Sequence, residues 1–192
     1  ARQSYAEDVE VRASYTQTSI KMIDALPADE AKRVVAAVRD ETWRAVRSAG
    51  PLAFIDMRLH LEVDGALHDV MGRERYEEAC AQLALDLMQR PLFAPVVRGR
   101  LLRGHPERLL ERMPVAWKLI FRDVGRAEVT PTDDGLSLAL RELPILVRHD
   151  EAFLHGVVGT LRGVGEACAT RIDVETEETK RGLGTIVFRL RF

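Results

Sequence analysis

The chain has 192 residues, of which 46% are hydrophobic and 30% charged, and its formal net charge is −2. These values are typical of one soluble globular domain, and the small negative charge argues against a nucleic-acid-binding protein. No apolar run approaches the roughly 20 residues that a membrane-spanning helix needs. With two cysteines and no leader-like start, the sequence predicts a cytoplasmic protein, and its strong preference for arginine over lysine indicates a bacterial source.

The N-terminal part is expected to be helical. Residues 1–26 are predicted to form an arm and then a short helix. Pro27 is followed by two carboxylates, which favours a helix start because proline fits the first turn and acidic groups suit the positive end of the helix dipole. That helix is predicted to run to about Arg47 and to end before Gly50-Pro51. We therefore assign residues 27–123 to a helical subdomain.

Residues 52–63 allow two interpretations. Apolar and polar side chains alternate from Ile55 to Val63, which favours an extended segment, followed by a short helix over Asp64–Met71. The same stretch also places apolar residues on one side of a helix, namely Leu52, Ile55, Leu59, Val63, Ala66 and Val70. We prefer the extended segment and keep the helix as the alternative.

Three further helices are predicted before the C-terminal third. Arg73–Gln89 has the clearest helical pattern, with a narrow apolar stripe. A second helix is expected over Leu92–Arg103 and a third after Pro106, which Pro114 interrupts. The segment 90–126 carries nine Arg or Lys residues against three acidic ones. It therefore forms either a solvated helix surface or a basic face for an anionic partner.

Residues 124–192 show the most regular pattern in the chain. Four stretches alternate apolar and polar side chains or flank turn-forming sequences, as strands with one buried face do: Arg126–Thr130, Leu136–Leu140, Arg171–Glu175 and Ile186–Phe192. A helix over Asp150–Ala169 separates the two hairpins. The predicted fold class is α+β: a four-stranded antiparallel sheet in ββαββ order with a helical N-terminal half packed on it, as one compact domain overall.

Histidines and carboxylates recur in one part of the chain. Asp56, His60, Asp64 and His68 follow one another at intervals of four, which on a continuous helix would give a stripe able to bind a metal. The preferred extended segment interrupts this spacing. His60 and His68 are therefore only weak metal-site candidates, and a solvated face is the alternative.

Motifs of covalent catalysis and phosphate binding do not occur. The sequence lacks GxSxG, GxxxxGK[ST] and a GxGxxG between a strand and a helix. Cys80 and Cys168 lie on apolar helix faces without a positive neighbour, which predicts buried structural thiols rather than nucleophiles. We name no catalytic residues and expect a protein that is not an enzyme.

Three glycines lie near one face of the helix predicted over 151–169. Gly156, Gly159 and Gly163 together cost roughly 2–3 kcal/mol of helix propensity relative to alanine, so something must offset them. Close packing of a neighbouring element is one explanation, and an apolar ligand between helices and sheet is the other. The candidate ligand-binding residues are Tyr76, Cys80, Trp117, Phe121, Phe153, Gly156, Val157, Gly159 and Leu161.

The order of elements also resembles a known superfamily. A helical part followed by strand–strand–helix–strand–strand is similar to the superfamily of heme–nitric-oxide-binding domains, 4-vinyl-reductase-type domains and acyl-chain-binding Golgi tethering subunits. Over Pro51–Phe192 the chain resembles uncharacterised myxobacterial proteins of about this length, through Arg90-Pro-Leu, Pro106-Glu-Arg-Leu-Leu, Pro114-Val-Ala-Trp117 and Phe121-Arg-Asp-Val-Gly125. The resemblance implies a domain that holds a small apolar ligand or a partner, often as a homodimer. Heme-binding members carry a Tyr-x-Ser-x-Arg motif that this sequence lacks, so we expect no heme, and the cofactor stays unknown.

Three functions follow in order of preference. The first is a non-enzymatic small-molecule-binding or sensory module with an apolar pocket between helices and sheet. The second is an interaction protein that forms a homodimer through its helices or through Thr185–Phe192 as an edge strand. The third is a metal-dependent enzyme that uses His60 and His68.

Overall fold

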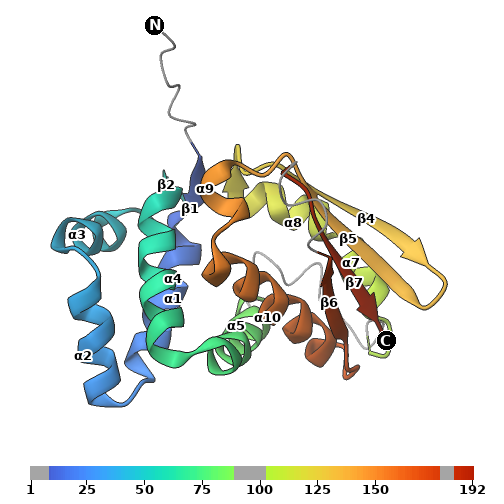
Figure 1. Ribbon diagram of the computed structural model, residues 1–192, viewed down its shortest axis with the longest axis horizontal. Coiled ribbons are helices and arrows are strands. Elements are labelled where there is room, and N and C mark those ends of the chain that lie inside the picture. The colour runs from blue at the N-terminus through green and yellow to red at the C-terminus, as the bar shows by residue number, and fades with distance from the viewer. Residues whose placement is uncertain (1–8, 89–102, 178–183) are drawn as a thin grey trace, which may run out of the picture.

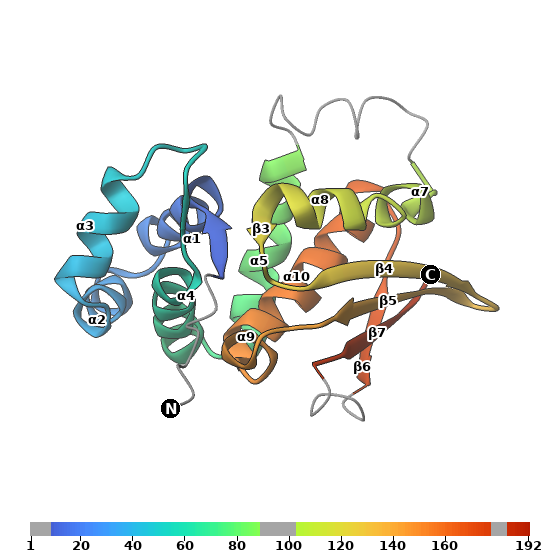
Figure 2. The same ribbon diagram turned by 90° about the horizontal axis from the view of Figure 1, so that it is seen from above.

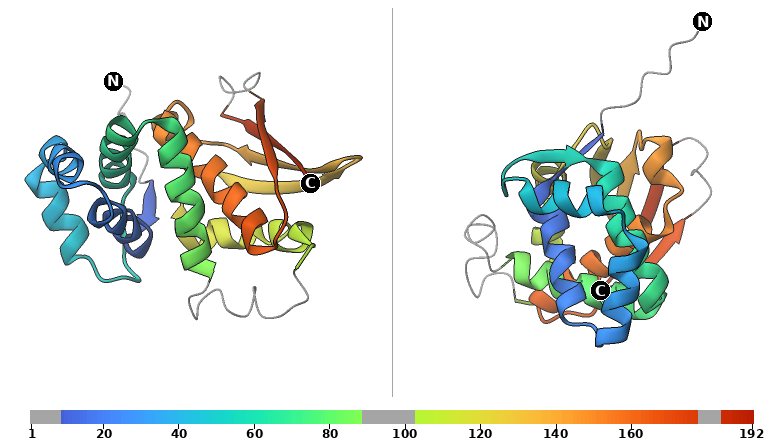
Figure 3. Two further views of the ribbon diagram at one scale, coloured as in Figure 1. Left: turned by 90° about the horizontal axis from the view of Figure 1, so that it is seen from below. Right: turned by 90° about the vertical axis from the view of Figure 1, so that its left-hand side faces the viewer.

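The computed structural model describes residues 9–88, 103–177 and 184–192. The N-terminal helices gather at one end of the molecule and a four-stranded sheet lies at the other (Figure 1). Two long helices stand between them, α5 (Arg73–Met88) and α10 (Glu151–Ala167), with α5 toward the N-terminal helices and α10 toward the sheet (Figures 2 and 3). Among the helices of the described residues, none is long and apolar enough to cross a membrane.

The main sheet contains four antiparallel strands in the order β4-β5-β7-β6. Its strands are β4 (Arg126–Thr132), β5 (Gly135–Arg141), β6 (Asp173–Glu177) and β7 (Ile186–Arg191). α10 lies between the two hairpins in sequence, and the Asp150 carboxylate caps it by accepting a hydrogen bond from the Phe153 N–H at 2.8 Å. The predicted α+β class with ββαββ order is therefore confirmed.

The two hairpins join through their most apolar strands. Leu138 of β5 is paired with Phe188 of β7, and both side chains are fully buried in the core. The opposite face of the sheet carries ion pairs such as Arg191–Glu175 and Arg189–Glu177. The expectation that Thr185–Phe192 is an edge strand is wrong, because burying β5 and β7 side by side leaves β4 and β6 at the edges.

A second, small sheet ties the N-terminus to the middle of the chain. β1 (Glu10–Arg12) pairs with both β2 (Phe54–Asp56) and β3 (Phe121–Arg122). Strands of two or three residues are too short to show a period, which explains why the sequence predicted only an arm here. The short helix that it predicted next is present as α1 (Ala13–Asp24).

The stretch that allowed two interpretations is mainly helical. β2 ends at Asp56, whose carboxylate accepts a hydrogen bond from the Arg58 N–H at 2.8 Å and so caps α4 (Met57–Met71). The preferred extended segment is right for Phe54–Asp56 and wrong from Met57 onward. The helical alternative is confirmed from Met57 onward, but Leu52 and Ile55, which it included, precede the helix. The alternation arose because α4 contacts α1, α2, α3, α5 and α10, so it buries side chains around much of its circumference.

The remaining helices differ in detail from their predictions. The helix expected from Pro27 to Arg47 is two helices, α2 (Ala28–Ala37) and α3 (Asp40–Ser48), because Val38 and Arg39 adopt extended backbone conformations. The region after Pro106 forms α7 (Pro106–Leu110) and α8 (Met113–Ile120), and the short α9 (Ile145–Arg148) was not predicted. The helix predicted over Leu92–Arg103 falls almost entirely outside the described residues.

Candidate functional site

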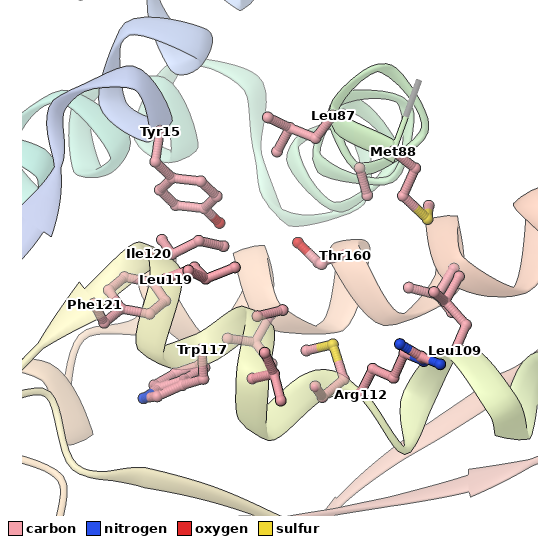
Figure 4. A pocket seen from close by; sticks show the side chains of 16 residues that line it. Tyr15, Leu87, Met88, Leu109, Arg112, Trp117, Leu119, Ile120, Phe121 and Thr160 are labelled. Atoms are coloured by element: carbon pink, nitrogen blue, oxygen red, sulfur yellow. The ribbon is translucent and has the colours of Figure 1, made fainter. Parts of the chain in front are cut away.

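A pocket opens between α1, α5, α8 and α10, with a cavity volume of about 170 Å³ (Figure 4). Most of its wall is aliphatic, aromatic or thioether. α8 supplies one side, and side chains of α5 and α10 supply the other. The lining residues are Tyr15, Ala84, Leu87, Met88, Leu109, Arg112, Met113, Val115, Ala116, Trp117, Leu119, Ile120, Phe121, Val157, Thr160 and Val164.

An aromatic cluster holds one wall of this pocket in place. The Trp117 ring lies 4.5 Å from the Phe121 ring between centroids, and Phe121 in turn contacts Tyr15 at 5.7 Å. Phe153 of α10 packs behind them, 5.8 Å from Phe121. The Trp117 indole N–H donates a hydrogen bond to the Val124 carbonyl oxygen at 3.3 Å. Rings fixed in this way make a largely preformed pocket wall.

Two hydroxyl groups and one cation interrupt the apolar lining. The hydroxyls of Tyr15 and Thr160 point toward one another (Figure 4). Burial, followed by the nearby Cys80 and Asp64, raises the pKa of Tyr15, so its phenol stays protonated. Arg112 is the one charged side chain among the lining residues that the structure describes.

The predicted ligand-binding residues divide into two groups. Trp117, Phe121 and Val157 line the pocket. Phe153 and Leu161 are buried in the core behind it. The remaining four do not line the pocket and lie where α5 packs against α10: Tyr76, Cys80, Gly156 and Gly159.

The glycines of α10 let α5 approach very closely. A Cβ atom on Gly159 would lie 2.3 Å from the Glu77 carbonyl oxygen, and one on Gly163 would lie 2.4 Å from the Ala81 carbonyl oxygen. Real side chains do not tolerate such distances. The helix propensity that the glycines cost is therefore offset by helix–helix packing, the first of the two explanations that the sequence allowed.

Several pocket residues were not foreseen from the sequence. Tyr15 comes from α1, whereas Met88 ends α5, Met113 begins α8 and Arg112 immediately precedes α8. The sequence shows that α8 is apolar, but it does not indicate which elements α8 contacts. Only the assembled helices bring these side chains together.

Histidines and carboxylates of α4 form buried contacts away from the pocket. His60 Nδ1 lies 3.3 Å from the Thr16 hydroxyl and 3.4 Å from Asp64 Oδ1, and the Tyr76 hydroxyl donates to Asp64 Oδ2 at 2.7 Å. His68 Nε2 lies 2.8 Å from Nδ1 of His155 on α10. Within the described ranges, no group of three or more histidine, cysteine or acidic residues is placed to hold a metal ion. These side chains join α4 to α1, α5 and α10.

Both cysteines are buried thiols. Burial, then the charge of Asp64, raises the pKa of Cys80, and burial likewise raises the pKa of Cys168. A raised pKa keeps the sulfur protonated, and a protonated thiol is a poor nucleophile.

Comparison with known proteins gives a match in structure only. No protein-family model matches the chain, and neither does any curated protein sequence. One similar solved structure comes from a study of heme distortion in the H-NOX family; its TM-score is 0.65, its identity is 19%, and 94% of each chain is covered. A variant H-NOX domain of T. tengcongensis has a TM-score of 0.62 and 17% identity over 94% of this chain and 97% of that one. An oxygen-binding H-NOX domain related to soluble guanylate cyclases has a TM-score of 0.60 and 18% identity over 94% of this chain and 93% of that one.

This match shows that the chain has the H-NOX fold. The resemblance to the superfamily of heme–nitric-oxide-binding domains is thereby confirmed as a distant similarity. The expectation of no heme is overturned, because the fold of heme domains extends over 94% of this chain. The absence of one sequence motif was too narrow a basis for that expectation.

Proposed function

We propose that the protein is a non-enzymatic sensory module that binds a small molecule in the pocket between α1, α5, α8 and α10. The observation that carries this proposal is the largely preformed apolar cavity of about 170 Å³, walled in part by aromatic rings. A dry apolar cavity of roughly 150 Å³ is large enough to bind benzene. The fold supports the same reading, since the matched H-NOX domains include one that binds oxygen.

Heme is one candidate ligand of this pocket. Methionine is a known axial ligand of heme iron, and Met88 and Met113 line the cavity. Tyrosine is another, but Tyr15 would first have to lose the phenolic proton that it keeps in this pocket. The Arg112 guanidinium suits a propionate carboxylate. The donor set therefore fits the group. A porphyrin is much larger than benzene, however, so α5 and α8 would have to separate to admit it. When bound, heme would supply the site for a diatomic gas.

Ligand binding can be followed through Trp117. The chain has two tryptophans, and Trp43→Phe leaves the one in the pocket wall as the sole indole. In this background, we expect saturable quenching or a spectral shift with toluene or 2-phenylethanol, and a Soret band at one equivalent if hemin binds. Ala116→Phe should abolish the response by filling the cavity, whereas Ala36→Phe on the exposed face of α2 should not.

Two outcomes would contradict the proposal. One is a parent protein that binds neither hemin nor any apolar probe. The other is an Ala116→Phe variant that binds the same probes unchanged, because the ligand would then lie elsewhere. For hemin, separate Tyr15→Phe, Met88→Leu and Met113→Leu variants would identify the axial ligand by the change in the absorption spectrum.

A further inference from the structure

We propose that the pocket selects ligands with one carboxylate on a small aromatic or short aliphatic body, and that Arg112 binds the carboxylate. This inference rests on the proposed function, since it assigns the chemical class of ligand to the same pocket. It follows from the contrast between a nearly uniform apolar wall and a single cation.

Arg112 lies where a ligand in the cavity could reach it. The residue precedes α8, and its guanidinium lies on the pocket side of the helix, near the Leu109 side chain (Figure 4). Its side chain is also exposed to solvent, which places it at the mouth rather than the bottom of the cavity. A carboxylate there would keep part of its hydration, so it would avoid the full cost of burying a charge.

Among the described residues, the Arg112 guanidinium has no ion-pair or side-chain hydrogen-bond partner. Some arginines of this protein are paired, for example Arg39 with Glu62 and Arg75 with Glu30, whereas Arg112 is, within the described chain, an unpaired arginine that also lines the pocket. Arg112 therefore has donors available to an anion from outside.

The surrounding charge favours an anion. Residues 103–126 carry six Arg or Lys residues against three acidic ones. A local excess of positive charge raises the concentration of anionic ligands near the pocket and speeds their association. The planar guanidinium fork also matches the two oxygens of a carboxylate better than an ammonium group does.

The rest of the pocket limits the body of the ligand. Its volume of about 170 Å³ corresponds to a benzene-sized group by comparison with the roughly 150 Å³ cavity that binds benzene. Arg112 is the one charged side chain of the described lining, so it is the group that can orient an anionic ligand by charge. A phenyl ring in the cavity with a short acidic side chain toward the mouth satisfies both features.

The test compares two ligands with the same phenyl body, one with a carboxylate and the other with a neutral hydroxyl group. Phenylacetate and 2-phenylethanol would be titrated into the full chain by calorimetry and by Trp117 fluorescence. We expect phenylacetate to bind at least tenfold more tightly than 2-phenylethanol. Arg112→Gln should weaken phenylacetate binding by tenfold or more and leave 2-phenylethanol unchanged, while Arg112→Lys should retain part of the preference. Lys118→Gln removes an exposed positive charge of α8 outside the pocket lining and should have little effect.

The possible failures can be told apart. Equal affinities for the two ligands, unchanged by Arg112→Gln, would overturn the carboxylate inference and leave the apolar pocket standing. Equal weakening by Arg112→Gln and Lys118→Gln would also overturn it, because the charge effect would then be nonspecific. Failure of every probe to bind the unmodified pocket would instead refute the proposed function. Because the backbone carbonyl of Arg112, not its side chain, accepts the first bonds of α8, the variants should fold, and circular dichroism checks this.

Discussion

The Nε2 atom of His68 lies 2.8 Å from the Nδ1 atom of His155, and the two imidazole rings stack with their centroids 4.9 Å apart. This contact joins α4 to α10. A hydrogen bond between two ring nitrogens needs one donor and one acceptor, so the pair cannot keep it when both facing nitrogens carry protons. Burial, followed by the charges of Arg73 and His68, lowers the pKa of His155.

The first prediction is a loss of stability in mild acid. Because the folded-state pKa of His155 lies below its unfolded value of about 6.5, the unfolded chain takes up a proton before the folded one does. The stability is fully present above pH 6.5 and falls as the pH drops from there toward the lower folded pKa. Glu77 and Glu151 oppose the shift but do not cancel it. Urea unfolding between pH 5 and 8 measures the effect.

His155→Gln should flatten this dependence, since glutamine can accept or donate a hydrogen bond but does not titrate. The matched control is His149→Gln, which changes an exposed imidazole just before the start of α10. An unaltered pH profile in the His155 variant would show that the pair has no part in the acid sensitivity.

A second prediction concerns the contact between α5 and α10. Gly159→Ala places a methyl group 2.3 Å from the Glu77 carbonyl oxygen, and backbone cannot easily move away. We expect the free energy of unfolding to fall by about 1–3 kcal/mol or more, as overpacking does. Gly65→Ala in α4 is the control, because no atom lies within 4 Å of the added Cβ. That variant should gain up to about 1 kcal/mol from helix propensity.

Denaturant unfolding of the two alanine variants gives the comparison directly. Similar gains in both would mean that the helices can separate at no cost. Close packing against α5 would then no longer account for the glycines of α10.

A third prediction concerns a buried carboxylate in the same contact. The Glu77 side chain is 3% exposed and pairs with Arg73 at 2.8 Å and with Arg162 of α10. Glu77→Gln keeps the shape but removes the charge that both guanidinium groups face. We expect a loss of about 1–3 kcal/mol, the usual cost of leaving buried polar groups poorly paired. Asp173→Asn breaks the exposed pair with Arg171 and should leave the denaturation midpoint in place.

The fourth prediction concerns Tyr76 and Asp64. The Tyr76 hydroxyl donates to Asp64 Oδ2, while Asp64 Oδ1 makes no hydrogen bond in the described part of the chain and has His60 Nδ1 at 3.4 Å. Tyr76→Phe would leave a buried carboxylate with still fewer donors, and we expect it to cost about 1–3 kcal/mol. The cost should shrink in an Asp64→Asn background, which a double-mutant cycle measures. Additive effects of the two substitutions would contradict a direct interaction.

The main sheet could be predicted from the sequence because its evidence is local. Alternation in Leu136–Leu140 and Ile186–Phe192 marks two strands with one buried face, and Asp150 marks the start of the helix between the hairpins. The order of the strands could not be predicted in the same way. The sequence of either hairpin alone does not indicate that β5 pairs with β7, because that pairing depends on which apolar strands bury each other.

The pocket was foreseen only in part, for a related reason. Trp117 and Phe121 belong to an apolar stretch that had to face something, and they do line the cavity. Tyr15 and Arg112 lie almost a hundred positions apart in the sequence, and no periodicity connects them. The alternation in Ile55–Val63 misled for the opposite reason, because a helix buried on several sides carries apolar residues at positions that imitate a strand.

The small sheet has a consequence for the order in which a newly made chain can fold. Arg12 at the end of β1 donates hydrogen bonds to the Leu52 carbonyl oxygen at 3.0 Å and to the Leu119 carbonyl oxygen at 2.6 Å, the latter 107 positions later. On a ribosome that adds about 5–20 residues per second, β1 must wait roughly 5–20 seconds for this partner to be synthesised. The first strand therefore waits until more than half of the chain has been made before its second neighbour exists.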